Sequence, residues 1–219
     1  MKVILCTHNS GGVGKITLAV HLAGYLSKWG EVLLVNCDEQ ADSWKFFMEK
    51  EPGVPVDQGS ARGIEVIANP ERRSLKKLKV KPNQFDFIVI DIDTVFSNTV
   101  QVILNAHPDL IFIPLNRFHM YKSIDNLASV LEMVGGIDGN PALPYSVVIV
   151  PLGIDKENIE SELERIEYHS EQYLVADFME DLSTKMDKLI YKDRRYIWDS
   201  VGLEHNKKYF EYLAFNTSR

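Results

Sequence analysis

The chain has 219 residues, 45% of them hydrophobic, which is enough for one domain with a sizeable core, and we predict a single domain over 1–219. Its 24 Lys and Arg against 31 Asp and Glu give a net charge of −7, which argues against a protein that binds nucleic acid over its whole surface. No apolar run approaches the roughly 18 residues of a membrane span, and the N-terminus begins like a strand instead of a signal peptide, so we expect a cytoplasmic protein.

Short runs rich in Val, Ile and Leu recur along the chain, at 1–6, 31–37, 87–92, 110–115 and 145–150. Helical patterns lie between them, the first at 16–29 and the last at 206–215. This alternation predicts an α/β fold, a doubly wound and mostly parallel sheet with helices on both faces and ligands at the carboxyl ends of the strands. The Pro, Gly and Ser content of 52–63 predicts a loop.

The only cysteines are Cys6 and Cys37, and each lies in an apolar run. Their spacing excludes a disulfide framework and a Cys-x-x-Cys metal site, so we expect buried thiols.

A glycine-rich segment, Asn-Ser-Gly-Gly-Val-Gly-Lys-Ile-Thr at 9–17, lies between the first strand and the first helix. Backbone N–H groups and a helix N-terminus in this context cradle phosphates, and Lys15 has the reach to contact the β- and γ-phosphates. Such a turn also caps helices without binding anything, but later strands end in carboxylates, which favours a phosphate loop. The predicted nucleotide-binding residues are Ser10, Gly11, Gly12, Val13, Gly14, Lys15, Ile16 and Thr17.

Segment 9–17 resembles the deviant Walker A loop of the ParA/MinD family, and three later segments resemble that family's other motifs. They are Asn-Cys-Asp-Glu-Gln at 36–40, Phe-Ile-Val-Ile-Asp at 87–91 and Ile-Pro-Leu at 113–115, so that the resemblance spans about the first 150 residues in order. The resemblance implies binding of ATP with Mg²⁺. It also implies that Asp38 positions the attacking water, and that Asp38 and Asp91 hold the metal ion through water.

Three residues depart from the family pattern. Ser10 replaces the signature Lys that reaches a dimer partner's phosphates, and Lys156 is our candidate for a substitute cation, although an ordinary exposed Lys is the simpler interpretation. Ile16 replaces the hydroxyl residue that ligates Mg²⁺, which leaves Thr17 for the α-phosphate. Asn36 replaces an Asp near the metal. We therefore expect a weakened metal site and a weak, partner-stimulated ATPase.

The resemblance also implies partners: a second copy in an ATP-dependent homodimer, nucleoid DNA bound without sequence preference, and a small protein that stimulates hydrolysis. The cargo of such a switch is a plasmid or a protein body, and similar members that distribute carboxysomes also carry Ser at the signature position. Two basic stretches, 72–81 and 185–195, are candidate DNA contacts. The second is favoured by the resemblance and contains Lys185, Lys188, Lys192, Arg194 and Arg195, although acidic residues are interspersed.

Two other functions stay open. A nucleotide-binding but hydrolysis-deficient regulatory or adaptor protein would explain Ser10, Ile16 and Asn36 together. A metabolic ligase on the same fold would need a second substrate pocket, which no motif marks. His8 either contacts a phosphate or packs, whereas His21 is expected to pack. We predict no membrane partner, because the C-terminal tail has too few basic residues for an amphipathic anchor.

Overall fold

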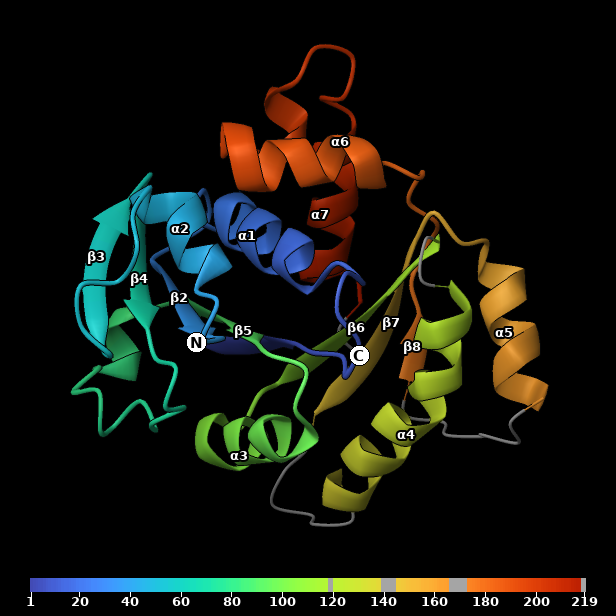
Figure 1. Cartoon of the computed structure of the whole chain (residues 1–219), viewed down its shortest axis with the longest axis horizontal. Helices are drawn as coiled ribbons and strands as arrows, with labels where there is room; N and C mark the ends of the chain where they lie inside the picture. Colours follow the sequence, from blue (N-terminus) through green and yellow to red (C-terminus); the bar gives the residue numbers. More distant parts are fainter. Residues whose placement is uncertain (118–119, 139–144, 166–172, 218–219) are drawn as a thin grey trace.

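The computed structural model describes residues 1–117, 120–138, 145–165 and 173–217, which form one twisted sheet between two layers of helices (Figure 1). The strands are β1 (Lys2–Cys6), β2 (Val32–Cys37), β3 (Asp57–Ala61), β4 (Ile64–Ala68), β5 (Phe87–Ile92), β6 (Leu110–Asn116), β7 (Ser146–Leu152) and β8 (Tyr173–Val175). The α-helices are α1 (Lys15–Leu26), α2 (Asp42–Met48), α3 (Phe96–Ala106), α4 (Met120–Asp138), α5 (Lys156–Arg165), α6 (Ser183–Asp187) and α7 (Asn206–Phe215). Shorter helical turns are η1 (Pro82–Gln84), η3 (Lys188–Asp193) and η4 (Ile197–Asp199).

The strand order is β3-β4-β2-β5-β1-β6-β7-β8, and every neighbouring pair is parallel except β3 with β4. The predicted α/β class and all five predicted strands are confirmed, as β1, β2, β5, β6 and β7. The crossover that follows β1 leads to β2 on one side of β1 in the sheet, whereas the crossover that follows β5 leads to β6 on the other side of β1. Ligands of such sheets bind at the carboxyl ends of the strands, beside this change of direction.

The prediction of a continuous loop at 52–63 is wrong, because residues 57–61 form β3 as the outer strand of a hairpin with β4. The two-residue turn at Arg62 and Gly63 has φ values of 55° and 74°, the left-handed conformation that tight hairpins favour. β4 supplies the apolar face of the hairpin and pairs with β2, while β3 is short and polar. Polar edge strands lack the alternating apolar signal by which strands are predicted.

Each central strand sends alternate side chains into two separate cores. Ile4 and Cys6 of β1 face the core under α1, α2 and α7, whereas Val3 and Leu5 face the core under α3, α4 and α5. Both predicted thiols are buried and unpaired with one another. Burial of both sheet faces explains why these strands are continuous apolar runs.

A buried aromatic cluster attaches the C-terminal segment to α1. The His21 ring stacks on Phe210 with centroids 4.7 Å apart, and its Nδ1–H donates to the Thr17 carbonyl over 2.7 Å. The Ile197 N–H donates to His21 Nε2 over 2.9 Å. His21 is therefore a packing residue, as predicted, and it ties the first helix to the segment that follows η3.

Candidate nucleotide-binding site

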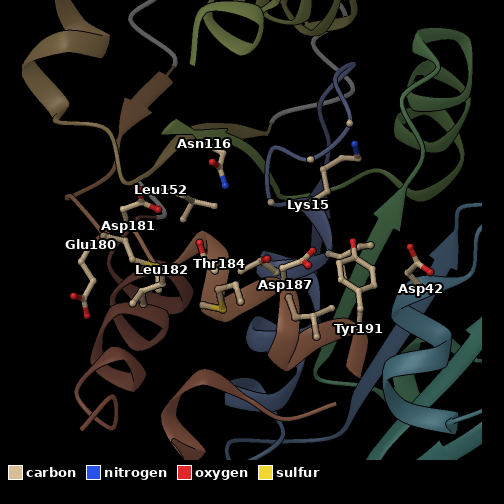
Figure 2. A pocket seen from close by; sticks show the side chains of 18 of the residues that line it. Lys15, Asp42, Asn116, Leu152, Glu180, Asp181, Leu182, Thr184, Asp187 and Tyr191 are labelled. Carbon is tan, nitrogen blue, oxygen red and sulfur yellow. The ribbon is translucent and has the colours of Figure 1, made fainter. Parts of the chain in front are cut away.

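A cavity of about 560 Å³ opens at the carboxyl ends of β1, β2, β5, β6 and β7 (Figure 2). The phosphate-loop residues lie at one end of it, and residues from the end of β6 and from the segment before α6 lie at the other. The lining comprises Gly11, Gly12, Gly14, Lys15, Ile16, Thr17, Asp38, Asp42, Thr94, Asn116, Leu152, Met179, Glu180, Asp181, Leu182, Thr184, Met186, Asp187, Ile190 and Tyr191.

The phosphate loop wraps around the start of α1. Gly12 and Gly14 have φ values of 71° and 108°, which only glycine adopts without strain. Lys15 is 92% buried, and its Nζ donates to the Ser10 carbonyl over 3.0 Å. Burial lowers the Lys15 pKa, while Asp91 and Asp38 oppose that shift. The loop thus presents backbone and one cation to the cavity, which is the arrangement that phosphate binding needs.

Ser10 does not line the cavity, although the sequence predicts it as a nucleotide contact. Its side chain is 99% buried, and its hydroxyl accepts a hydrogen bond from Asn126 Nδ2 on α4 over 3.1 Å. Its N–H donates to His8 Nδ1 over 3.0 Å. Val13 is also fully buried. The residue at the signature position therefore points into its own chain, and His8 supports the loop from within.

Two carboxylates predicted to hold the metal lie beneath the phosphate loop. Asp91 is the second-last residue of β5, next to Asn36 of β2; it is buried and does not line the cavity, and both its carboxylate oxygens lack a hydrogen bond in the described residues. Burial, as the main cause, raises the Asp91 pKa to about 7. The nearby Ser43 hydroxyl opposes this shift, although it forms no hydrogen bond of ordinary geometry with Asp91, and the charge of Asp38 adds to the shift. Asp38 is partly exposed in the cavity and accepts a hydrogen bond from the Gln40 N–H over 2.9 Å, and burial raises its pKa too.

The donor set fits a hydrated magnesium ion better than a directly ligated one. Ile16 lines the cavity and packs on the core, so it offers no oxygen at the position of the usual hydroxyl ligand. In the described part of the chain, no three His, Cys, Asp or Glu side chains are arranged to hold a metal. The unpaired oxygens of Asp91 and the exposed carboxylate of Asp38 are suited to accept hydrogen bonds from water on a phosphate-bound Mg²⁺.

The far end of the cavity has apolar walls with a few polar groups. Met179 and Leu182 line it together with Asn116, the last residue of β6, while the Leu152 side chain lies directly against Gly14 of the phosphate loop. A base needs such flat apolar walls and a few oriented polar groups. The position of Asn116 at a strand end is a signal that sequence reasoning missed. Met179 and Leu182 gave no signal, since only tertiary packing brings them to the cavity.

A further group of lining residues comes from α6 and η3. In Figure 2, Tyr191 lies between Asp187 and Asp42, below Lys15 of the phosphate loop. Burial raises the Tyr191 pKa to about 12, and Asp42, Asp91 and Asp187 add to that shift. The C-terminal segment thus closes one wall of the cavity with acidic and aromatic groups, which sequence reasoning did not identify.

The remaining predicted residues lie outside the cavity. Lys156 is the first residue of α5 and pairs with Glu160 at 3.7 Å. Asp93 accepts hydrogen bonds from the Val95 N–H over 2.9 Å and from Asn98 Nδ2 over 2.7 Å, as expected of a residue in the loop before a helix.

Both basic stretches present exposed basic residues, and in 185–195 Lys185, Lys192 and Arg195 form no ion pair within the described residues. In 185–195, Lys188 lies 3.8 Å from Asp193, and Arg194 has a φ of 50° with its carbonyl bonded to Arg62. In 72–81, the apolar residues Leu75, Leu78 and Val80 pack against the core. The lysines between them are exposed and form no ion pair within the described residues; they are Lys76, Lys77, Lys79 and Lys81.

The eight-stranded sheet and the glycine-rich loop between β1 and α1 give this chain the fold of ParA/MinD-type P-loop proteins, the fold that the sequence predicts. A family model described as an AAA domain matches residues 1–52. Over 52 residues the chain is 48% identical to the uncharacterized protein BBD21 of Borreliella burgdorferi, a match that covers 23% of this chain and about a fifth (21%) of that protein.

Three solved structures share the fold over nearly the whole chain. A Borrelia burgdorferi chain described as a plasmid partition protein and bound to AMPPNP is 20% identical, with a TM-score of 0.69 and coverage of 96% of this chain and 95% of that one. Cyanothece McdA in complex with ATP is 19% identical, with a TM-score of 0.74 and coverage of 100% and 98%. MinD from a MinC:MinD complex of Aquifex aeolicus is 15% identical, with a TM-score of 0.67 and coverage of 97% and 95%. Among the described helices, none has the length and apolar character needed to cross a membrane.

Proposed function

We propose that this chain is an ATP-binding positioning protein. It forms a homodimer when ATP is bound, and the homodimer dissociates when ATP is hydrolysed. This cycle distributes a plasmid or a protein body on nucleoid DNA. The observation that carries the proposal is the cavity that joins a glycine-rich phosphate loop to an apolar end beside Asn116. Its volume suits a nucleotide. Similar solved chains include a plasmid partition protein and McdA with AMPPNP and ATP.

Each residue of the site has a proposed part in hydrolysis. Lys15 leaves the Ser10 carbonyl and neutralises the β- and γ-phosphates, because an ammonium group binds phosphate more strongly than a neutral carbonyl. Thr17 contacts the α-phosphate. Asp38 orients the attacking water, and Asp38 with Asp91 orders the hydration shell of Mg²⁺, which supplies charge neutralisation on the transferred phosphoryl group.

Turnover is proposed to be slow without a partner. Ile16 withholds a metal ligand, and Ser10 cannot supply a cation to a second subunit because a hydroxyl is neutral; its side chain is also buried against α4. Each tenfold loss in rate corresponds to about 1.4 kcal/mol of transition-state stabilisation, so two missing interactions account for a rate several orders of magnitude lower. Lys156 remains our candidate for the substitute cation, if a partner or second copy approaches α5.

DNA contact is proposed through backbone phosphates alone. The exposed lysines of 76–81 are not paired with carboxylates in the described structure, so this surface joins 185–195 as a candidate. Each phosphate contact contributes about −0.9 to the slope of log affinity against log salt on duplex DNA. Replacing Lys76, Lys77, Lys79 and Lys81 by Gln, or the five basic residues of 185–195 by Gln, will show by the change in slope which surface binds.

The first experiment measures the mass of the purified chain with ATP and Mg²⁺, with ADP, and without nucleotide, by light scattering on a sizing column. A dimer with ATP alone supports the switch, and DNA binding by the same state supports positioning. ATP binding without dimerisation would contradict the switch.

A second function is favoured by two observations, the buried orientation of Ser10 and the apolar Ile16 in the metal region. A regulatory or adaptor protein that binds nucleotide without hydrolysing it would need neither the signature Lys at position 10 nor the metal-binding hydroxyl at position 16. Turnover measured with a candidate stimulating partner separates the two functions, because only the switch accelerates.

A further inference from the structure

Ser10 is held by hydrogen bonds at each of its polar groups. Its N–H donates to His8, its hydroxyl accepts from Asn126, and its carbonyl accepts from Lys15. The same Asn126 side chain receives a hydrogen bond from Asn9 Nδ2 over 3.3 Å. The Asn126 side chain on α4 is therefore hydrogen-bonded to two consecutive residues at the start of the phosphate loop, although α4 comes more than 100 positions later in the chain.

The bond between Lys15 and Ser10 competes with phosphate binding by the same ammonium group. Lys15 has one ammonium group, and contact with the β- and γ-phosphates draws it away from the Ser10 carbonyl. His8 and Asn126 then remain as the side chains that fix Ser10. His8 lies between β1 and the loop, so it fixes Ser10 from within the same segment. Asn126 lies on α4 and therefore joins the loop to another layer of the fold.

We propose that Asn126 is a positioning residue for nucleotide binding, which holds the loop entry in the binding conformation through Ser10 and so couples α4 to the occupancy of the phosphate site. This proposal rests on the proposed nucleotide site. The burial of Ser10 supports it, since a residue that is 1% exposed has its hydroxyl held in one place by the bond from Asn126. A molecule that binds to α4 and displaces it would change the affinity for nucleotide without contacting the nucleotide.

The test is a double-mutant cycle with Ser10→Ala and Asn126→Ala, measured as the affinity for a fluorescent ATP analogue with Mg²⁺. Each single variant is expected to bind about 5- to 10-fold more weakly, the range of one lost hydrogen bond. The double variant is expected to bind no more weakly than Asn126→Ala alone, because Asn126→Ala already removes the side-chain bond that Ser10→Ala removes, together with the bond to Asn9. Losses that multiply, or no loss in either single variant, would overturn the proposal.

Two controls separate positioning from general destabilisation. Asn105→Ala removes an α3 amide that donates to the Arg72 carbonyl over 3.2 Å, outside the cavity, and should leave the affinity unchanged. Urea unfolding of the nucleotide-free variants checks that each one is folded under the binding conditions, and the two substitutions should be non-additive there as well, because the Ser10–Asn126 bond does not require nucleotide. If Asn126→Ala does not fold, Ser10→Ala, which removes one oxygen, carries the prediction together with the milder Asn126→Ser. A wild-type chain that binds no nucleotide would refute the proposed function itself, whereas binding without coupling refutes only the role of Asn126.

Discussion

The strongest prediction about stability concerns the buried His21, which links α1 to the C-terminal segment. Its Nδ1–H donates to the Thr17 carbonyl and its Nε2 accepts from the Ile197 N–H, so the neutral ring satisfies both partners. A proton on Nε2 would oppose the Ile197 N–H. Burial, as the main cause, lowers the His21 pKa to about 4 from an ordinary value of 6.5.

The sign follows from proton binding. Between pH 6.5 and pH 4 the unfolded chain binds a proton at His21 and the folded chain does not, so the free energy of unfolding falls as pH falls through this window. With the two pKa values above, the contribution of His21 decreases by about 2 kcal/mol between pH 7 and pH 5.

The assay is urea unfolding of the nucleotide-free wild type and of His21→Gln at pH 7, 6 and 5. The variant is less stable at pH 7 because it loses ring packing, but it lacks the titrating group. The wild type should therefore lose about 2 kcal/mol more than the variant between pH 7 and pH 5. The comparison between variants is necessary, since Asp91 titrates in the opposite direction in both. Parallel losses in the two proteins would refute a neutral, buried His21.

Ile16→Thr should lower the Mg²⁺ concentration needed for half-maximal ATP turnover and raise the turnover about tenfold, as a restored hydroxyl ligand would; an unchanged magnesium titration would argue against this account of the metal site. The folded pKa of Asp91 is about 7, so the wild type loses stability as Asp91 ionises, whereas Asp91→Asn does not. In urea unfolding without nucleotide, the stability of Asp91→Asn relative to the wild type should therefore be about 3 kcal/mol higher at pH 8 than at pH 5. A difference that does not depend on pH would contradict this prediction. Gly24→Ala should destabilise the chain by about 1–3 kcal/mol, because a Cβ there meets the Tyr196 ring, whereas Gly136→Ala on α4 meets nothing within 4 Å and should gain up to about 1 kcal/mol. Equal urea midpoints for these two variants would show that Tyr196 yields at no cost.

The central sheet and the phosphate loop could be predicted from the sequence because their signals are local. A parallel strand covered on both faces is a continuous apolar run, which identified β1, β2, β5, β6 and β7. A phosphate loop needs glycines and a Lys at fixed spacing between a strand and a helix, and this spacing identified Lys15. The β3 strand was missed because a polar edge strand carries no such run, whereas β4 was missed although Ile64, Val66, Ile67 and Ala68 are apolar and buried.

The tertiary structure alone decided which side chains complete the site and which way they face. The sequence predicts Ser10 as a nucleotide-binding residue, but the packing of α4 buries it and bonds it to Asn126. Asp187 and Tyr191 belong to a stretch that the sequence suggests only as a basic surface, yet the aromatic cluster around His21 folds that stretch over the cavity. Contacts between segments more than 100 residues apart depend on how the helical layers pack, and no local pattern of residues specifies them.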